Sequence, residues 1–434
     1  MNIYKNQLIN YFLEQNIIDK LLLILFIAIP YFYISGPFLT DVALIIIVFL
    51  FFIKIKKLDN KKNIILLFFI FSITIYLFFN HLLLNNVDKN YIKSLFYFRF
   101  LIIVPVAFLI FKKIKFVRIF FYAIMLANLI VIFDIFFQKI FGFNTIGIDA
   151  IESFNKGMHF ITLIDSIGNV TRYSGFFGSE LIAGGYISRF FLINLIFLEY
   201  ELKNYKIEIS NIKRSFIIIV FTCIVFLGIL LTGERSALLF ALLSFALYLV
   251  FYNLFKDKMI FGFITLFFIA MLMLGSANFK ERFFNSSINE LKIKVIDEIQ
   301  LEEVYQNKHF SHYSSAVEIF KENIIFGGGF KNYRNICDGS KYECSTHPHN
   351  IFLEIISSIG IVGFILFYLF FILYYKIYLN NNKHRSTNII YFTFVIMSFM
   401  FVLPTGSIFN NYFSLLSFYS LAALSVAITT LKIN

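Results

Sequence analysis

The sequence predicts an all-α, polytopic membrane protein. Hydrophobic residues make up 59% of the 434 residues, charged residues only 15%, and the mean hydropathy is +0.79. A globular core could not bury that much apolar surface. The apolar residues are gathered in runs of about 17–25 residues, which is the length that a helix needs to cross a bilayer.

Twelve such runs are expected to be membrane spans. No small-residue cleavage site follows the first run and another span comes soon after it, so we expect it to remain as a helix and not to be removed as a signal peptide. The runs occupy residues 18–36, 41–55, 63–84, 94–111, 117–138, 178–199, 215–232, 236–255, 259–275, 350–375, 388–404 and 411–430.

The basic residues between these runs predict the orientation of the chain. If the N-terminus is cytoplasmic, most loop lysines and arginines lie on the inner side. Apart from Lys139 at the very end of the fifth span, the outer loops between neighbouring spans hold Lys89, Lys93, Lys156, Arg172 and Arg235. The positive-inside rule then places both termini in the cytoplasm. This distribution accounts for the net charge of +12 without a nucleic-acid partner.

One predicted connection is long: residues 276–348, between the ninth and tenth spans, on the outer side. It holds nine Lys/Arg and ten Asp/Glu, so it is not a tail that binds polyanions. Tyr313, Val317 and Phe320 recur at helical spacing, and Gly327–Gly329 is expected to end that helix in a turn. We therefore expect all 434 residues to form a single transmembrane domain with a partly helical, functional capping loop.

Two of the three cysteines are expected to pair. Cys223 lies inside the seventh predicted span, where it is a small apolar residue. Cys337 and Cys344 have six residues between them and precede two histidines, His347 and His349. On the oxidising side of a bacterial membrane we expect a disulfide, which would contribute about 2–3 kcal/mol by closing a short loop. A zinc site made of these four residues is the alternative, but the spacing lacks a CxxC pair.

Charged side chains gather at the outer ends of several predicted spans. Arg172, Glu180, Arg235 and His349 would lie in one layer of the membrane, and Glu234 precedes Arg235 in a turn where the positive-inside rule disfavours arginine. If only one arginine lay there, we would interpret it as an interfacial residue whose guanidinium extends to water. Two outer arginines and a histidine from three segments favour a shared anion site, and the forked donors of guanidinium match phosphate oxygens.

Three further charged residues, Arg99, Asp134 and Arg189, lie deeper in the predicted spans. Ionisable side chains inside a membrane are costly, and they are usually paired or functional. For these three, a structural ion pair and a ligand role are equally expected.

His347 and His349 flank Pro348 at the entry to the tenth predicted span. Because they are two residues apart around a proline, they cannot share a helical face, so one can point at a substrate while the other braces the loop. Pro348 suits the first turn of a helix. Asn350 and Glu354 are four residues apart and could hydrogen-bond along the helix, whereas Glu354 lies off the face of His349, so no His–Glu dyad is expected.

Four motifs follow one another between residues 172 and 363. The first is Arg172-x-x-Gly175, and the second is Thr232-Gly-Glu-Arg235-Ser. The third combines Gly327-Gly-Gly329-Phe330 with Cys337…Cys344-Ser-Thr-His-Pro-His-Asn350. The fourth is His349-Asn350, followed after nine residues by Gly360-x-x-Gly363. This series resembles bacterial O-antigen ligases and the related O-antigen polymerases, as do twelve spans with one large outer loop. By motif the resemblance covers roughly residues 170–375, and it implies a GT-C-like membrane fold.

The resemblance implies transfer of a glycan from undecaprenyl pyrophosphate at the periplasmic face, with no metal, nucleotide or other cofactor. It implies that Arg172 and Arg235 bind and neutralise the departing pyrophosphate. His349 would act as base on the acceptor hydroxyl or orient it, with His347 as the alternative base, and attack opposite the leaving group would invert the anomeric centre. The residues expected to bind substrate are His347, Asn350, Glu180, Glu234 and Tyr313.

Two acceptors are compatible with the resemblance. A ligase moves the finished chain onto lipid A-core in lipopolysaccharide biosynthesis at the bacterial inner membrane, and a polymerase moves a growing chain onto the next lipid-linked unit. We favour ligation, with a protein-glycosylating relative as a third option. A transporter or flippase of lipid-linked oligosaccharides would place charges at midplane on broken helices and would rarely need a folded outer loop of 73 residues.

Overall fold

The computed structural model is helical, as the sequence predicts. Apart from an isolated bridge, all regular secondary structure in the residues that it describes is helical. The described residues are 15–54, 61–84, 91–111, 114–148, 172–178, 180–204, 210–251, 262, 265–267, 269–271, 308–342, 344–379, 385–399 and 405–431.

Eight of the described helices are long and apolar enough to cross a membrane by length and composition. Two shorter apolar helices, α11 (Arg235–Phe251) and α19 (Arg385–Phe399), fall on the eighth and eleventh predicted spans, and α9 (Ala183–Asn204) falls on the sixth. Most of the ninth predicted span, 259–275, lies outside the described residues. The structure therefore confirms an all-α, polytopic membrane protein. The eight helices are Ile17–Ser35, Pro37–Lys54, Ile64–Leu84, Ile92–Ile110, Phe116–Phe141, Lys213–Thr232, Ile351–Tyr378 and Asn411–Thr430.

The chain divides into two compact units. Unit 1 comprises residues 1–56, 106–283 and 422–434, and unit 2 comprises residues 57–105 and 284–421. The described helices of unit 1 are α2 (Ile17–Ser35), α3 (Pro37–Lys54), α7 (Ile114–Phe141), the 3-10 helix η3 (Gly175–Phe177), α9, α10 (Asn211–Thr232) and α11, with the last part of α20 (Asn411–Thr430). Those of unit 2 are α4 (Lys61–Leu84), α5 (Ile92–Leu95), most of α6 (Phe98–Ile110), α16 (Lys308–Glu322), α17 (Tyr333–Ile336), α18 (Ile351–Tyr378), α19 and the first part of α20.

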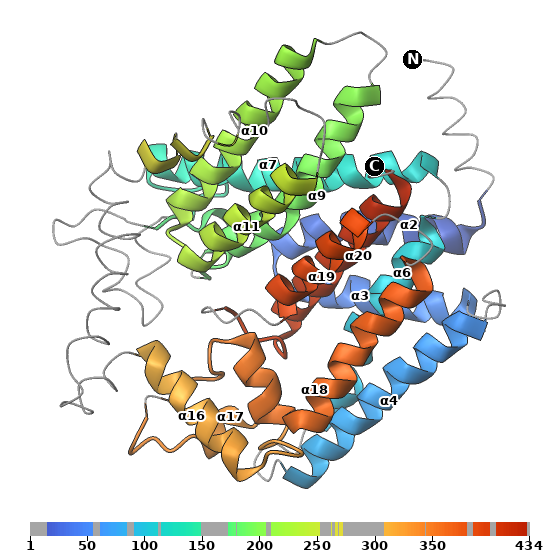
Figure 1. Ribbon diagram of the computed structural model, residues 1–434, viewed down its shortest axis with the longest axis vertical. Helices are drawn as coiled ribbons and strands as arrows, with labels where there is room; N and C mark the ends of the chain where they lie inside the picture. The colour runs from blue at the N-terminus through green and yellow to red at the C-terminus, as the bar shows by residue number, and fades with distance from the viewer. Residues whose placement is uncertain are drawn as a thin grey trace. The chain divides into compact units, whose positions relative to one another are not determined.

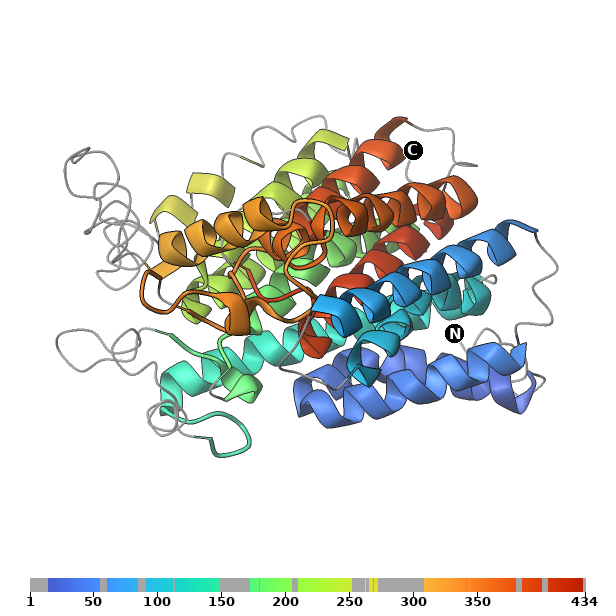
Figure 2. The same cartoon turned by 90° about the horizontal axis from the view of Figure 1, so that it is seen from below.

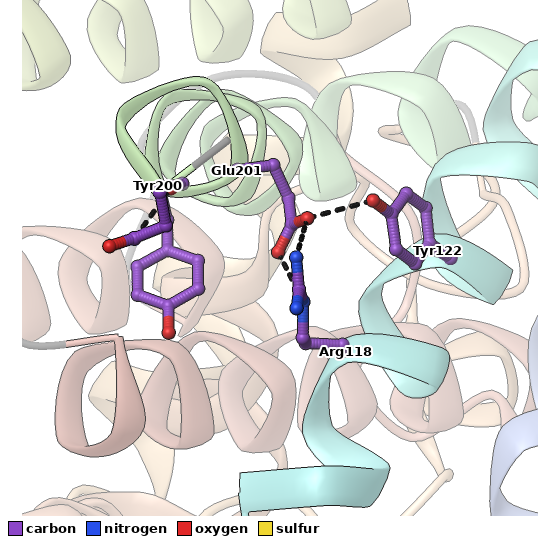
Figure 3. Close-up of polar contacts among 5 residues, drawn as sticks. Arg118, Tyr122, Tyr200 and Glu201 are labelled. Carbon is purple, nitrogen blue, oxygen red and sulfur yellow. Dashed lines mark hydrogen bonds and ion pairs between the residues drawn. The ribbon is translucent and has the colours of Figure 1, made fainter. Parts of the chain in front are cut away.

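In unit 1, α9 packs against α7, α10 and α11, while α2 packs against α3 and α7 (Figure 1). An ion pair joins α7 to α9 near the C-terminal end of α9. Figure 3 shows Arg118 and Tyr122 of α7 pointing toward Glu201 of α9. The Arg118 guanidinium donates from Nε to Oε1 at 2.7 Å and also to Oε2, and the Tyr122 hydroxyl donates to Oε2 at 2.8 Å. A two-pronged pair of this kind fixes orientation as well as distance, so it sets α9 against α7.

In unit 2, α4 and α18 run side by side (Figure 1 and Figure 2), and α18 also contacts α16, α17 and α19. The backbone of α18 is not helical at Gly360, which has φ 63° and ψ −169°. The loop after α16 supplies the hydrogen bonds that the broken helix cannot make for itself. The Gly328 and Gly329 amides donate to the carbonyls of Ser357 and Ser358, at 2.7 and 2.9 Å. Irregular backbone at membrane depth is tolerated where protein groups satisfy it in this way.

Glycine is required at this contact because two backbones touch there. A Cβ added at Gly360 would lie 2.3 Å from the Ile325 carbonyl oxygen and 2.6 Å from the Gly327 nitrogen. Asn80 of α4 braces the same loop, donating from Nδ2 to the Phe326 carbonyl and accepting from the Phe330 amide, both at 2.7 Å. Gly327–Gly329, expected to end the preceding helix in a turn, instead follows the turn at 323–326 and docks into α18.

Gly360→Ala is expected to destabilise unit 2. The positive φ alone costs an L-residue about 1–2 kcal/mol, and the close approach to Ile325 adds overpacking. Gly339→Ala is the matched control, because a Cβ there meets nothing within 4 Å. We expect the temperature at which half of the detergent-purified protein stays monodisperse to fall by several degrees for Gly360→Ala and to stay unchanged for Gly339→Ala. Equal temperatures for the two variants would contradict the docking of loop and helix.

Candidate functional site

Arg172, in unit 1, is held at the C-terminal end of α10. Its Nε donates to the Thr232 carbonyl at 3.1 Å, and the Tyr173 amide donates to the Leu231 carbonyl at 3.0 Å. The last carbonyls of a helix lack partners within the helix and carry partial negative charge, so a guanidinium is favourable there. The side chain is 9% exposed and lies on Gly233, where a Cβ would be 2.8 Å from Arg172 Cγ.

The segment that follows Arg172 is tied to α7. Gln138 Oε1 accepts from the Gly175 amide at 2.8 Å, and the Asn144 side chain donates to the Gly175 carbonyl at 3.0 Å. Asp134, expected to be an ion pair or a ligand, instead accepts from the Thr145 amide at 2.8 Å and from the Thr145 hydroxyl. The bonds from Gln138 and Asn144 position the backbone at Gly175, three residues after Arg172.

Glu234 binds the first turn of α9. Its two carboxylate oxygens accept from the Gly184 and Gly185 amides at 2.7 and 3.0 Å, which satisfies donors that a helix start leaves unpaired. Burial raises the pKa of Glu234 to about 7, and Arg172 is the main group that opposes this rise. Glu234, predicted to bind substrate, thus has both oxygens engaged by the protein backbone.

Arginines surround this carboxylate. Burial lowers the pKa of Arg172, Glu234 opposes that change, and the charge of Arg235 at the start of α11 lowers it further, so the two arginines lie within electrostatic reach. Arg189 of α9 is 5% exposed, lies 5.3 Å from the centroid of the Phe240 ring and also interacts with Glu234. The structure places Arg172, Glu234 and Arg235 together in unit 1, with Arg189 beside them, and the shared anion site stays a prediction. Arg172 and Arg189 thus both interact electrostatically with Glu234, while Arg235 interacts with Arg172.

Glu180 is the remaining predicted site residue of unit 1. It is exposed, and its backbone amide donates to the Phe177 carbonyl at 3.0 Å, just after η3. The contacts that hold Arg172, Glu234 and Arg189 do not involve the Glu180 side chain.

In unit 2, the predicted histidine segment leads directly into α18. Asn350 is the N-cap of that helix, is fully buried, and accepts from the Leu353 amide at 3.0 Å. His349 precedes it with a positive φ of 53°, its carbonyl accepts from the Thr405 amide at 2.7 Å, and its Nε2 lies 3.1 Å from Ser345 Oγ. A positive φ is uncommon outside glycine, although histidine, like asparagine and aspartate, adopts it more readily than other residues do, and strained conformations cluster at functional sites.

Three imidazoles lie together around His349. Its ring centroid is 4.1 Å from that of His347 and 5.2 Å from that of His312, which α16 contributes. Burial and the neighbouring His312 lower the pKa of His347 to about 4, although the Thr405 backbone opposes the change. His312 is 6% exposed and was not predicted, because nothing in its local sequence separates it from an ordinary helix residue.

Tyr313 and Glu354 occupy different surroundings. Burial raises the pKa of the Tyr313 hydroxyl to about 12, against a smaller effect of the Asn350 side chain. Glu354 accepts from the Ser407 hydroxyl and from the Ile408 amide, the latter at 2.8 Å. Asn350 and Glu354 are joined by the backbone bond from the Glu354 amide to the Asn350 carbonyl, at 2.9 Å. Their side chains have other partners: the helix start engages that of Asn350, and the segment at 407–408 engages that of Glu354.

Cys337 and Cys344 form a disulfide with a Cα–Cα distance of 5.9 Å. The Ser315 hydroxyl of α16 donates to Cys337 Sγ at 3.2 Å, so the bridge packs against the helix that carries His312. A zinc set of these cysteines with His347 and His349 would need free thiolates. Among the residues that the structure describes, no three His, Cys, Asp or Glu side chains are placed to hold a metal ion.

The lowered pKa of His347 predicts a pH-dependent stability. The unfolded chain binds a proton below about pH 6.5, whereas the folded chain does so only near pH 4, so stability is lost as the pH falls through this window. His347→Gln removes the group, and the unfolding temperature of the variant should fall less between pH 7 and about pH 5 than that of the unmodified protein. The check is thermal unfolding in detergent at both pH values; an equal fall for the two proteins would contradict the buried neutral imidazole.

One family model matches part of the chain. Residues 219–368 match the family model described as O-Antigen ligase. The matched segment contains Arg235, the three imidazoles, the disulfide and Gly360, whereas Arg172 lies before it. No curated protein matches the sequence. Together with the all-helical, polytopic fold, the match over residues 219–368 supports membership of the O-antigen ligase superfamily.

Proposed function

We propose that this protein is a membrane glycosyltransferase that transfers a glycan from undecaprenyl pyrophosphate to an acceptor at the periplasmic face. The observation that carries the proposal is the pair of arginines, Arg172 and Arg235, held around a turn between two helix ends within electrostatic reach of each other. A bound anion would interact favourably with both guanidinium groups, and Arg189 adds a third positive charge near Glu234.

Arg235 supports an anion as the ligand. It stands at the first position of α11, where the helix dipole disfavours a cation but the free backbone amides favour an anion. A pyrophosphate at this place would gain from both the amides and the guanidinium. As the bond to the sugar breaks, negative charge grows on the departing pyrophosphate, and donors already held in place stabilise it at no cost of reorganisation.

His349 is the proposed base. The acceptor hydroxyl gives its proton to the imidazole as its oxygen attacks the anomeric carbon, the bond from that carbon to the pyrophosphate oxygen breaks, and undecaprenyl pyrophosphate leaves with the electron pair. Attack from the side opposite the leaving group inverts the anomeric centre. The pKa of His347, about 4, makes it a weak base near neutral pH, which supports His349 for this step. The residues proposed to shape the acceptor site are His347, Asn350 and Tyr313, with Glu180 and Glu234 on the donor side.

The proposed setting is the bacterial inner membrane, with both termini cytoplasmic and residues 276–348 as a periplasmic loop inserted into one transmembrane domain. The distribution of lysine and arginine between the spans supports this orientation. The disulfide between Cys337 and Cys344 also supports it, because such bonds persist on the oxidising side of the membrane. The reaction needs no metal or nucleotide in this proposal.

The acceptor is proposed to be lipid A-core, with a second lipid-linked glycan as the alternative. The experiment supplies purified protein with an undecaprenyl-pyrophosphate glycan and equal amounts of both acceptors. Lipid A-core carrying the glycan is the expected product, and longer lipid-linked glycans would instead identify a polymerase. Absence of both products, with a protein that is folded and binds the donor, would contradict the proposed transferase.

A further inference from the structure

The loop that docks into the break of α18 exposes three consecutive large apolar side chains. Ile324, Ile325 and Phe326 are 48%, 59% and 54% exposed. They follow directly on α16, in the segment that the sequence predicts to be part of the outer loop. In a loop surrounded by water, three such neighbours would form an unfavourable apolar patch. We therefore expect an apolar surrounding to cover these side chains.

The backbone carbonyls of the same residues are bonded within the protein. The Ile324 and Ile325 carbonyls accept from the Ile361 and Val362 amides of α18, at 3.0 and 3.2 Å. The Phe326 carbonyl accepts from a side-chain amide of α4 at 2.7 Å. Water would satisfy these carbonyls in an aqueous loop, but in hydrocarbon each must find a protein partner. Bonded carbonyls combined with exposed apolar side chains are the pattern expected for a segment in lipid.

The loop also continues the apolar outer surface of two membrane helices. Ile361, whose amide bonds to the loop, is itself 42% exposed, and Ile365 one turn further along α18 is 49% exposed. On α4, Phe79 and Leu83 flank the asparagine that bonds to the loop and are 51% and 70% exposed. On helices that cross a bilayer, such faces contact lipid. The three loop side chains thus extend a surface that already faces acyl chains.

We propose that Ile324-Ile325-Phe326 is a re-entrant segment whose side chains contact the acyl chains of the bilayer. The segment lies level with the last turn of α4, about 6 Å from the end of that helix at 1.5 Å per residue. It anchors the C-terminal end of α16, and with it the helix that carries His312, to the membrane. Part of the predicted periplasmic loop is therefore embedded. This inference needs only a membrane protein, not the proposed reaction.

Spin labels test the surroundings of the segment directly. Ile325→Cys is labelled in a Cys223→Ser background, which leaves the disulfide intact, and the protein is reconstituted in phosphatidylcholine and phosphatidylglycerol vesicles. Collisions with oxygen report lipid, and collisions with a water-soluble nickel complex report water. Ile365→Cys is the lipid-facing control, and Lys321→Cys in the last turn of α16 is the water-facing control.

We expect the label at Ile325 to show the high ratio of oxygen to nickel collisions that Ile365 shows. A ratio as low as that at Lys321 would place the segment in water, and low collision rates with both probes would mean that protein covers it. Either result overturns the proposal. Phe326→Asp gives a second measurement, with Phe326→Leu as control: we expect a several-fold lower yield of monodisperse protein for aspartate only, and equal yields would contradict a lipid contact.

Discussion

His349→Asn is expected to abolish glycan transfer while the protein remains folded and inserted in the membrane. Asparagine tolerates the positive φ of 53° at this position, so the change removes the imidazole without straining the entry to α18. His349→Ala also removes the imidazole, but alanine is strained at this positive φ. If both variants lose the same activity, the loss is due to the missing imidazole and not to backbone strain. Loss of a general base costs about 10²–10⁴-fold in rate. The measurement is the rate of transfer from an undecaprenyl-pyrophosphate glycan.

Two further variants control this experiment. His347→Asn should keep more activity than His349→Asn, because an imidazole with a pKa of about 4 is a weak base. Lys331→Asn changes the other described non-glycine residue with positive φ, 57°, and should leave transfer unchanged. Full activity of His349→Asn, or loss confined to His347→Asn, would remove His349 from the proposed role.

Replacement of Arg172 and Arg235 is expected to impair use of the donor. Removal of one preorganised donor from a site that stabilises a developing anion costs about 10²–10³-fold. We therefore expect Arg172→Gln and Arg235→Gln each to lower kcat/KM for the lipid-linked donor by about 10²-fold. Arg235→Lys should lose less, because it keeps the charge but not the two-pronged geometry.

Arg172 also caps α10, so its variants need a structural control. Arg172→Lys keeps a positive charge near the Thr232 carbonyl, and its unfolding temperature shows how much of the effect is structural. Arg334→Gln changes an exposed arginine of α17 and should behave as the unmodified protein. Unchanged kinetics in the glutamine variants of both Arg172 and Arg235 would rule out their proposed contact with pyrophosphate.

Much of the fold could be predicted from the sequence because it depends on local composition. An apolar run that is long enough predicts a membrane helix at its own position. Eight of the predicted runs coincide with helices that are long and apolar enough to cross a membrane. The helix at 308–322 also follows from neighbouring residues. The expectation that Pro348 lies in the first turn of the next helix is wrong, because Asn350 is the N-cap and the helix begins at Ile351. The break at Gly360 could not be predicted, because it depends on Gly327–Gly329 reaching a helix that lies some thirty positions further along the chain.

The sequence predicted the types of residue in the candidate site better than it predicted the contacts between them. The two arginines could be grouped by topology, and the structure holds them at adjacent helix ends. That Glu234 binds the start of α9, and that Arg189 interacts with it, depends on helix packing that charge patterns do not reveal. In the same way, His312 reaches His349 only because α16 packs against α18.

The most direct test of the proposed reaction is the release of undecaprenyl pyrophosphate during glycan transfer by the purified protein. The donor lipid and the glycosylated acceptor are quantified together by mass spectrometry over one time course. We expect one undecaprenyl pyrophosphate for each glycan transferred, and neither product with His349→Asn. Transfer without release of undecaprenyl pyrophosphate, or release that continues unchanged in His349→Asn, would contradict the proposed function.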